Sequence, residues 1–518
     1  MDSISGWRAK GTCLNSERVL PKEGGANAAS LLKPWPLHDI AASRALEVAH
    51  PEEGSVGLHA DGLPPQPGLM QLAGLATAEL ALAIAPHAEV FWIACGPGNN
   101  GGDGMEAAVH LKRWGKTPVI TQETATVRDN KPSPDAQRAR QTALHAGVAF
   151  QAEPPAHFDL AIDALFGIGT LRPWSSTHAR WIEHINTSGT PVLAVDLPSG
   201  LNANTGAAVP LHVQASHTLS LLTLKPGLFM GHGRDACGDI WFNGLGIAPG
   251  LTQASSTAHL LAPPPMQERA HASHKGSYGD VCVVGGAPGM AGAALLAGSA
   301  ALYGGAGRVY LCGLDDAYPQ HHLHQPELMV RPLADMPLEE LTVVAGCGGG
   351  ARIAGVLPIL LDHAQHLLLD ADALNAISQD AALQQLVRQR RAGSTILTPH
   401  PLEAARLLAG STTQVQADRL KAVSELVHKF QCTVVLKGSG TVVQAPGTPP
   451  YINVTGSGNL ATAGTGDVLA GLMGAYWARH TNALTAASLG IYRHGQVADT
   501  WKQQSGLALS AGRLARRL

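Results

Sequence analysis

The chain has 518 residues, which is more than one ordinary hydrophobic core can organise, so two large domains are expected. Hydrophobic residues make up 45% of the sequence and charged residues 14%, a composition that excludes a disordered or collagen-like protein. There are 36 Lys and Arg residues against 39 Asp and Glu residues, a net charge of -3. This balance argues against nucleic acid or an anionic membrane as the main partner.

The seven cysteines are widely scattered and include no C-x-x-C pair, so neither a disulfide framework nor a zinc knuckle is expected. Residues 1–30 mix charges without the apolar segment of a secretory signal, and no apolar run reaches membrane-spanning length. We therefore expect a cytoplasmic protein with no membrane partner. The Gly, Ser and charge content of residues 1–36 predicts a flexible N-terminal extension.

From about Leu37 to Ile247, short apolar runs alternate with Ala- and Leu-rich stretches, which predicts β-α-β units on a parallel sheet. The segment 248–266 interrupts this rhythm with prolines and serines, and we place a domain boundary near residue 256 within it. Beyond it the alternation resumes, so two consecutive α/β domains are predicted, over 37–255 and 256–518. The strands expected are 90–94, 160–162, 192–195, 281–284, 341–345, 367–369 and 433–436, with a helix over 291–303.

A glycine-rich segment, Cys95–Gly104, follows the strand 90–94 and precedes an expected helix over 105–114. Exposed backbone N–H groups at such a helix start can bind an anion, and glycines let a phosphate approach closely. A plain strand-to-helix turn would look much the same. The added Asn99, Asn100 and Asp103 favour a ligand site, because a simple turn does not need these oxygen atoms.

Two more strand ends in this half carry polar groups, Asp163–Thr170 and Asp196–Leu201. The carboxyl ends of parallel strands meet in one crevice, where ligands bind. Asp163, Asp196 and Ser199 could therefore join Asn100 around an oxygen-lined site. Either Asp alone is explained as well by a helix N-cap or turn.

Together these three segments resemble the NAD(P)H-hydrate epimerase family over roughly residues 37–247, and Gly68–Gly74 is similar to that family's opening helix. The resemblance implies a Rossmann-like domain in which Asn100, Asp163 and Ser199 hold K⁺, and Asp196 performs acid/base chemistry on the hydrated nicotinamide. Gln71 stands where Glu is usual, and Ile168–Thr170 departs from the family pattern. The substrate contacts that the resemblance implies are Asn99, Asn100, Gly101, Gly102, Asp103, Gly167, Ile168, Gly169, Thr170 and Asp196.

The strongest motif of the second half is Asn459–Gly471, with Gly464-Thr465-Gly466 at the start of an expected helix over 467–476. Unobstructed N–H groups there can stabilise phosphoryl charge together with the helix dipole. Asp467 can act as a base, although an N-cap would explain this residue alone.

Further motifs occur in an order that resembles the ADP/ATP-dependent NAD(P)H-hydrate dehydratase family, a ribokinase-like fold, from about His274 to the end. They include Asp370–Asn375, Thr398–Glu403 and Lys437–Thr441. The resemblance implies ADP as co-substrate with Mg²⁺. It places Ala293, Gly348, Gly350, His400 and Asp467 on the hydrate, and Lys437, Gly438, Ser439, Gly440, Thr441 and Gly466 on the nucleotide. Cys347 departs from this pattern, because Pro is usual there, and Leu402 replaces a usual Gly.

The two resemblances together imply an enzyme that repairs NADHX and NADPHX, the hydrated forms of NADH and NADPH. The first domain would interconvert the R and S hydrates, and the second would dehydrate the S hydrate with ADP, releasing AMP and phosphate. A homo-oligomer is expected. The alternative is a ribokinase-like sugar or vitamin kinase fused to a non-catalytic binding module.

Overall fold

The computed structural model describes residues 17–18, 34–49, 67–123, 133–169, 173–247, 256–262, 269–315, 325–479, 481–504 and 507–518. Two compact units divide the chain: Met1–Ala28 with Pro36–Ala258, and Ala29–Trp35 with His259–Leu518. Each contains one sheet with helices packed on it. The predicted fold class, two consecutive α/β domains, is confirmed.

The first unit is built on an eight-stranded sheet in the order β1-β9-β8-β7-β6-β3-β4-β5. All neighbouring strands are parallel except β1 and β9. The strands are β1 (Glu17–Arg18), β3 (Val90–Cys95), β4 (Thr117–Gln122), β5 (Ala149–Gln151), β6 (Leu160–Ala164), β7 (Val192–Val195), β8 (His217–Leu221) and β9 (Asp239–Asn243), and β2 (Pro36–Leu37) lies outside this sheet.

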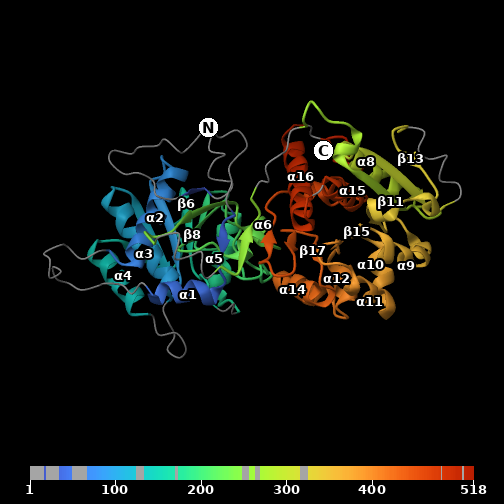
Figure 1. The fold of residues 1–518 in the computed structure, drawn as a ribbon. Helices are drawn as coiled ribbons and strands as arrows, with labels where there is room; N and C mark the ends of the chain where they lie inside the picture. Colours follow the sequence, from blue (N-terminus) through green and yellow to red (C-terminus); the bar gives the residue numbers. More distant parts are fainter. Residues whose placement is uncertain are drawn as a thin grey trace. The chain divides into compact units, whose positions relative to one another are not determined.

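Strand side chains alternate between two apolar clusters, one on each face of the sheet. Ile93 and Cys95 of β3 pack with the helices α2 and α3, whereas Trp92 and Ala94 pack with α5. Figure 1 shows α2, α3 and α4 gathered on the same side. The helices of this unit are α1 (Ile40–Ala49), α2 (Leu69–Ile84), α3 (Asn99–Arg113), α4 (Pro134–His145), α5 (Ser176–Thr187) and α6 (Gly233–Ala236), with the 3-10 helix η3 (Pro226–Phe229).

The chain order reverses at β3, which lies between β4 on one side and β6 on the other. Such a switch point opens a crevice at the carboxyl ends of the strands, because the connections on its two sides run in opposite directions. Asn100 follows β3 and Asp163 lies in β6, so the fold brings these two predicted ligands to the same crevice.

The second unit holds the strand order β13-β12-β11-β14-β15-β16-β17-β18-β19-β10. Strands β17, β18 and β19 pair antiparallel and the other neighbours are parallel. The switch point lies between β11 and β14. The strands are β10 (Ala258–Leu260), β11 (Asp280–Gly285), β12 (Arg308–Gly313), β13 (Met329–Val330), β14 (Thr342–Ala345), β15 (His366–Leu369), β16 (Thr395–Leu397), β17 (Thr433–Leu436), β18 (Val442–Gln444) and β19 (Tyr451–Ile452).

One face of this sheet is covered by α8, α15 and α16, whose Ala-rich surfaces share a core with Val281, Val344 and Ile396. Small side chains allow close packing, as at Gly471, where a Cβ would lie 1.9 Å from the Ala297 carbonyl oxygen. Figure 1 shows α10, α11, α12 and α14 grouped on the other side. The helices are α8 (Ala291–Tyr303), α9 (Ile353–His363), α10 (Asp372–Gln379), α11 (Ala381–Gln389), α12 (Pro401–Leu407), α13 (Thr412–Ala417), α14 (Arg419–Phe430), α15 (Thr465–Ala478), α16 (Ala483–Gln504) and α17 (Ala511–Ala515), and the short 3-10 helices are η4 (Lys275–Tyr278), η6 (Leu333–Asp335), η7 (Leu338–Glu340), η8 (Gly350–Arg352) and η9 (Gly458–Leu460).

Three expectations about local structure are wrong. Helix α3 begins at Asn99, not at residue 105, because Gly98 takes the N-cap position and the following glycines pack tightly. The expected linker contains β10, since Ala258 and Leu260 are buried and His259–Leu260 pairs with Tyr451–Ile452. Within the expected extension, Glu17–Arg18 pairs with β9. Most of the extension, the prolines of the linker and Thr170 lie outside the described residues.

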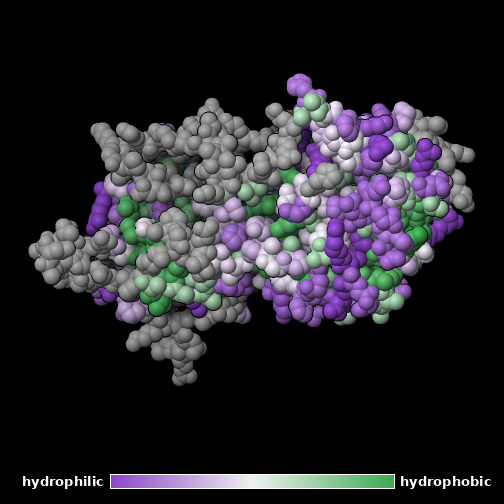
Figure 2. Space-filling view, viewed as in Figure 1, coloured by the Kyte–Doolittle hydropathy of each residue, from purple (hydrophilic) through white to green (hydrophobic). Residues whose placement is uncertain are grey.

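Hydrophilic side chains dominate the visible face of the unit 259–518 in Figure 2, with hydrophobic residues scattered among them. The large hydrophobic residues that are exposed, such as Trp114, Met290 and Leu402, come from different elements. Among the described residues, no helix is long and apolar enough to cross a membrane.

Candidate active sites

The first turn of α3 forms one wall of the candidate site in the first unit. A Cβ on Gly101 would lie 2.0 Å from the Gly96 carbonyl oxygen, and one on Gly102 would lie 2.6 Å from the Met70 side chain. Only glycine fits at position 101, because its close neighbour is backbone, whereas a side chain at position 102 would require the Met70 side chain to move. The glycines therefore bring the N-terminus of a long helix, with its partial positive charge, to the crevice.

Asp163 is fully buried at the end of β6, where three donors reach its carboxylate. The Ser199 N–H donates to Oδ2 at 2.7 Å, the Ser199 hydroxyl donates to Oδ1 at 2.7 Å, and the Leu165 N–H donates to Oδ1 at 3.2 Å. Burial raises the pKa of Asp163 to about 6, although the bonds from Ser199 and Leu165 oppose this shift. A cation beside this carboxylate would stabilise its charged form.

Asn100 faces the same place from the first turn of α3. Its Oδ1 is 3.2 Å from the point where a Cβ on Gly167 would lie, so Gly167 leaves room for the amide. Its Nδ2 is buried without a hydrogen-bond partner. Buried polar groups are rarely left unpaired, and such an exception often marks an ion or water site.

Asp196 and Lys225 form a buried ion pair in the same unit. The ammonium of Lys225 contacts Oδ1 of Asp196 and also donates to the Leu221 carbonyl at 2.8 Å. Asp196 has a φ of 67°, in the left-handed region that few residues other than glycine, Asn and Asp adopt. Backbone conformations of this kind cluster at functional sites.

In the second unit, Asp467 lies in the first turn of α15, after Gly464 at a φ of 87°. Burial, and then the nearby Asp370, raise the pKa of Asp467 to about 6, whereas a hydrogen bond with Cys347 and the charge of Lys437 lower it. A carboxyl group with such a pKa is ionised at neutral pH but remains a competent base.

Asp370 follows β15 and is the partner of Lys437, whose ammonium contacts Asp370 Oδ1. The same oxygen accepts a bond of 2.7 Å from the Thr398 hydroxyl. Burial alone would lower the pKa of Lys437, but Asp370 and then Glu403 outweigh it and the pKa is raised. A Cβ on Gly466 would lie 3.7 Å from Lys437 Nζ, so this cation faces the start of α15.

His400 is the N-cap of α12, where its Nδ1 accepts from the N–H groups of Leu402 and Glu403 at 3.1 and 3.2 Å. Its Nε2 lies 3.2 Å from Glu403 Oε1. Burial, followed by the charge of Lys437, lowers the pKa of His400, while burial raises the pKa of Glu403 to about 7.

Ala293, Gly348 and Gly350 surround the switch point between β11 and β14. A Cβ on Gly348 would lie 2.9 Å from that of Ala293, and the Gly350 N–H donates to Asp372 Oδ2 at 2.9 Å. Gly348 and Gly350 have φ values of 58° and 52°. This loop thus has the left-handed backbone that its glycines predict.

The segment Lys437–Thr441 is the turn between β17 and β18. Arg419, which is 2% exposed, donates to the carbonyls of Leu436 and Lys437 at 3.1 Å each and to that of Gly440 at 3.4 Å. Burial lowers the pKa of Arg419 to about 10. The Arg419 guanidinium therefore holds this turn through its backbone carbonyls, and the side of the turn that faces away from Arg419 is left for a ligand.

Comparison with known proteins covers both units. A family model described as YjeF-related protein N-terminus matches residues 67–227, and one described as NAD(P)H-hydrate dehydratase matches residues 281–518. The bifunctional NAD(P)H-hydrate repair enzyme of Escherichia coli (strain K12) is 35% identical over 461 residues, which are 85% of this chain and 86% of that protein. The chain belongs to the family of bifunctional NAD(P)H-hydrate repair enzymes.

Single-domain relatives match the second unit of this repair-enzyme chain. The ADP-dependent (S)-NAD(P)H-hydrate dehydratase of Neisseria meningitidis serogroup B is 43% identical over 266 residues, 49% of this chain and 89% of that protein. A crystal structure of the ADP/ATP-dependent NAD(P)H-hydrate dehydratase from Bacillus subtilis, co-crystallised with ATP and Mg²⁺, is 30% identical. It covers 48% of this chain and 91% of its own, with a TM-score of 0.43.

The sites of this repair-enzyme chain gather most of the predicted residues, whose roles stay predictions. Asn100 lies next to Gly167, Ser199 is hydrogen-bonded to Asp163, and Ala293 lies against Gly348. Asn99 turns outward, where it accepts a bond of 2.5 Å from Ser133, and Ile168 and Gly169 are partly or fully exposed. Lys437, predicted on the nucleotide, points to Asp370.

Sequence reasoning missed Lys225, Arg419, Thr398 and Glu403 as parts of these sites. Lys225 and Arg419 lie far along the chain from the groups they contact, and an isolated Lys or Arg usually lies at the surface. Glu403 belongs to the predicted motif Thr398–Glu403, but its capping-box bond of 2.8 Å from the His400 N–H needed the helix start to be known.

The two expected metals fit their sites differently. Asn100, Asp163 and Ser199 suit K⁺, because they offer oxygen atoms around a buried carboxylate to which no cation is paired among the described residues. Cys347, Asp370 and Asp467 place ligand atoms within 4.8 Å of one another. This cluster does not fit Mg²⁺, since Lys437 already neutralises Asp370 and burial raises the pKa of the Cys347 thiol well above its usual value.

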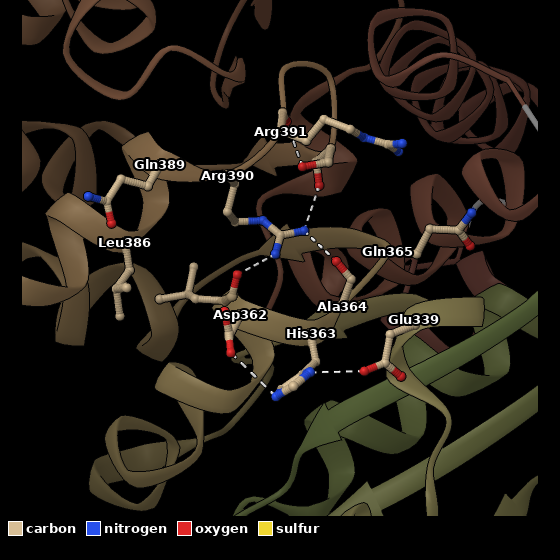
Figure 3. Close-up of a pocket in the computed structure, with 11 residues that line it drawn as sticks. Glu339, Asp362, His363, Ala364, Gln365, Leu386, Gln389, Arg390 and Arg391 are labelled. Carbon is tan, nitrogen blue, oxygen red and sulfur yellow. Dashed lines mark hydrogen bonds and ion pairs between the residues drawn. The ribbon is translucent and has the colours of Figure 1, made fainter.

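A hollow of about 440 Å³ lies at the opposite edge of the second sheet, before β15 and β16 (Figure 3). Two of its charged side chains, Arg390 and His363, are paired with the protein itself. Arg390 donates to the carbonyls of Leu361 and Ala364 at 2.5 and 2.7 Å, and His363 lies between Glu339 and Asp362. The predicted site residues do not line it, so the carboxyl edge remains the candidate active site.

Proposed function

We propose that the first unit epimerises the R and S hydrates of NADH and NADPH, and that the second unit dehydrates the S hydrate with ADP as phosphoryl donor. The observation that carries this proposal is that each unit places a carboxylate suited to proton transfer, the buried Asp196 or the half-buried Asp467, at the carboxyl edge of its sheet. The relatives that match both units support it.

In the first reaction, the hydroxyl at C6 of the hydrate leaves as water, which produces an iminium ion, and water then adds to the other face. Asp196 would give a proton to the leaving hydroxyl and accept one from the entering water. Oxygens of Asn100, Asp163 and Ser199 would hold K⁺, which supplies a fixed positive charge that orders the crevice. The backbone N–H groups of Asn99–Gly101 would bind a phosphate of the substrate, since the Gly102 N–H already donates to the Gly98 carbonyl at 3.2 Å.

In the second reaction, Asp467 would accept the proton of the C6 hydroxyl while the hydroxyl oxygen attacks the β-phosphate of ADP. The N–H groups of Gly464–Gly466 would stabilise the transferring phosphoryl group, and Lys437 would provide positive charge beside Gly466. Elimination of phosphate then restores the dihydronicotinamide, and AMP is released. Phosphate is a much better leaving group than hydroxide, which explains the need for the nucleotide. Ala293, Gly348, Gly350 and His400 would line the hydrate, and the turn Lys437–Thr441 would contact the nucleotide.

The test incubates separated R and S hydrates with the protein, with and without ADP. Chromatography follows R/S exchange, and absorbance follows the restored cofactor. We expect exchange without nucleotide and restoration of NADH or NADPH only with ADP. Accumulation of a stable phosphorylated product without restored cofactor would favour the kinase alternative.

A further inference from the structure

Lys225 is placed differently from an ordinary surface lysine. It lies between β8 and η3 and is 2% exposed, and its neighbours Thr223, Leu224 and Phe229 are also buried. A buried ammonium must be compensated, and Lys225 has two acceptors, Oδ1 of Asp196 and the Leu221 carbonyl. The fold therefore holds a cation directly behind the carboxylate that we assign to proton transfer.

The two oxygens of Asp196 have different surroundings. Oδ1 accepts from Lys225 Nζ and from the Leu221 N–H at 3.2 Å. Among the described residues, no donor reaches Oδ2. The side chain of Asp196 is 12% exposed. One oxygen is thus occupied by the protein, and the other is left for a ligand.

The backbone conformation of Asp196 also favours an arrangement in which Oδ1 faces Lys225 and Oδ2 is left for a ligand. Asp196 is held at a φ of 67° by its own N–H, which donates to the Leu219 carbonyl at 2.8 Å. This left-handed conformation ends β7 abruptly and turns the side chain toward the loop that carries Lys225. A free residue would leave such a conformation readily, because it costs energy for a non-glycine residue.

We propose that Lys225 is a positioning residue of the epimerisation: it fixes Oδ1 of Asp196 so that Oδ2 points at the reacting hydroxyl, where it can give and take the proton. The inference rests on the proposed epimerase function. Asp163 gives a comparison within the same sheet, since it is buried without a cation and burial raises its pKa to about 6. Asp196, by contrast, has the Lys225 ammonium against its Oδ1.

Other charged groups also face this pair. Glu47 and Arg44 come from α1, and burial, followed by the charge of Asp196, raises the pKa of Glu47. His38, just before α1, donates its backbone N–H to the Leu224 carbonyl at 2.8 Å. Helix α1 is tied to the same loop by a bond of 2.7 Å between the hydroxyls of Ser43 and Thr223. Because these groups can also influence the pH profile of R/S exchange, the profile of the unmodified protein must be compared with that of variants that change only Lys225.

The experiment compares Lys225→Met and Lys225→Arg in the full chain, by R/S exchange rates from pH 5 to 9. Lys225→Met should lower kcat by ~10²-fold with a KM change below about threefold, and should change the shape of the pH profile. Lys225→Arg keeps the charge and should restore the rate to within about tenfold. Lys116→Met, which breaks the Lys116–Glu89 ion pair of the same unit, is the matched control and should change nothing.

A double-mutant cycle separates positioning from folding. If Lys225 acts through Asp196, Lys225→Met should cost little more in a chain that already carries Asp196→Asn. Additive losses, or an unchanged rate and pH profile in Lys225→Met, would overturn the inference. Absence of R/S exchange in the unmodified protein would instead overturn the epimerase function itself, so the two failures are distinguishable.

Discussion

The thiol of Cys347 lies within 4.8 Å of the carboxylate of Asp467 at the switch point of the second sheet. Cys347 is fully buried, and burial raises the pKa of its thiol well above the usual value, so the sulfur keeps its proton and can donate. Proline, which is usual at this position in the dehydratase family, cannot supply that donor. The environment of the predicted base is thus partly specific to this chain.

We predict that Asp467→Asn leaves the fold intact and lowers S-hydrate dehydration by ~10² to 10⁴-fold. The amide keeps nearly the same volume but cannot accept the hydroxyl proton. Affinity for ADP should change little, because the turn Lys437–Thr441 is untouched, and R/S exchange should be normal. Asp362→Asn, at a side chain that is 76% exposed, is the control. Full turnover by Asp467→Asn would assign this residue a structural role.

Dehydration should depend on pH through the same group. The pKa of Asp467 is raised to about 6, and a base works only when ionised, so kcat/KM should fall about tenfold per pH unit below pH 6 and level off above it. The bond from Cys347 lowers this pKa, so Cys347→Ala should move the acid limb to higher pH. A limb that does not move in Cys347→Ala would show that the thiol has no influence on the base.

Much of the architecture could be predicted from the sequence because its strands are apolar throughout and end in glycine or polar turns. The expected strands 192–195 and 433–436 and the helix 291–303 coincide with β7, β17 and α8. The position of Asn100 and Asp163 at the same edge of the sheet also follows from strand order, since parallel strands end at one edge.

The missed features depend on contacts between distant parts of the chain. The helical start of α3 at Asn99 contradicts the low helix propensity of glycine, and it depends on close packing against Gly96, where a Cβ on Gly101 would not fit. Likewise, β10 depends on pairing with β19, which lies far along the chain. Lys225 and Arg419 carry no local signal of the buried acceptors that they meet.

Asp196→Asn should abolish epimerisation while ADP-dependent dehydration of the S hydrate persists in the same chain. Asparagine tolerates the left-handed backbone at this position, so the loop should keep its shape. The loss expected on removing the base is at least ~10²-fold. Dehydration of the S hydrate by the other unit is the internal control, and an unchanged exchange rate would reassign Asp196 to a structural role.

We also propose domain bounds of 37–255 and 256–518, which separate the two units close to the division after Ala258. Fragments cut after residue 255 should fold separately, the first catalysing R/S exchange without nucleotide. A cut after residue 262 removes β10 from its partner β19 and should lower the melting temperature of the second fragment. Insolubility of both fragments from the first cut would indicate a single interdependent fold.

K⁺ should stabilise the first unit, and more strongly at pH 8 than at pH 5. Burial raises the pKa of Asp163 to about 6, so ionising this carboxylate in the folded state lowers the stability of the unit. This loss of stability is absent below the pKa of the unfolded chain and becomes complete as the pH rises through 6. A cation that binds the ionised carboxylate offsets this cost, by about 2.7 kcal/mol at a concentration 100 times its Kd. Protons compete with the cation at pH 5, which reduces the effect.

Hydrogen exchange at the Leu165 and Phe166 amides, which bond to Asp163 and Ser199, reports on this site directly. Protection should increase in KCl relative to choline chloride at equal ionic strength, and Asp163→Asn should abolish the difference. Ser199→Ala should reduce it, because the hydroxyl is a proposed ligand and also donates to Asp163. Equal protection in both salts at pH 8 would exclude K⁺ from this crevice.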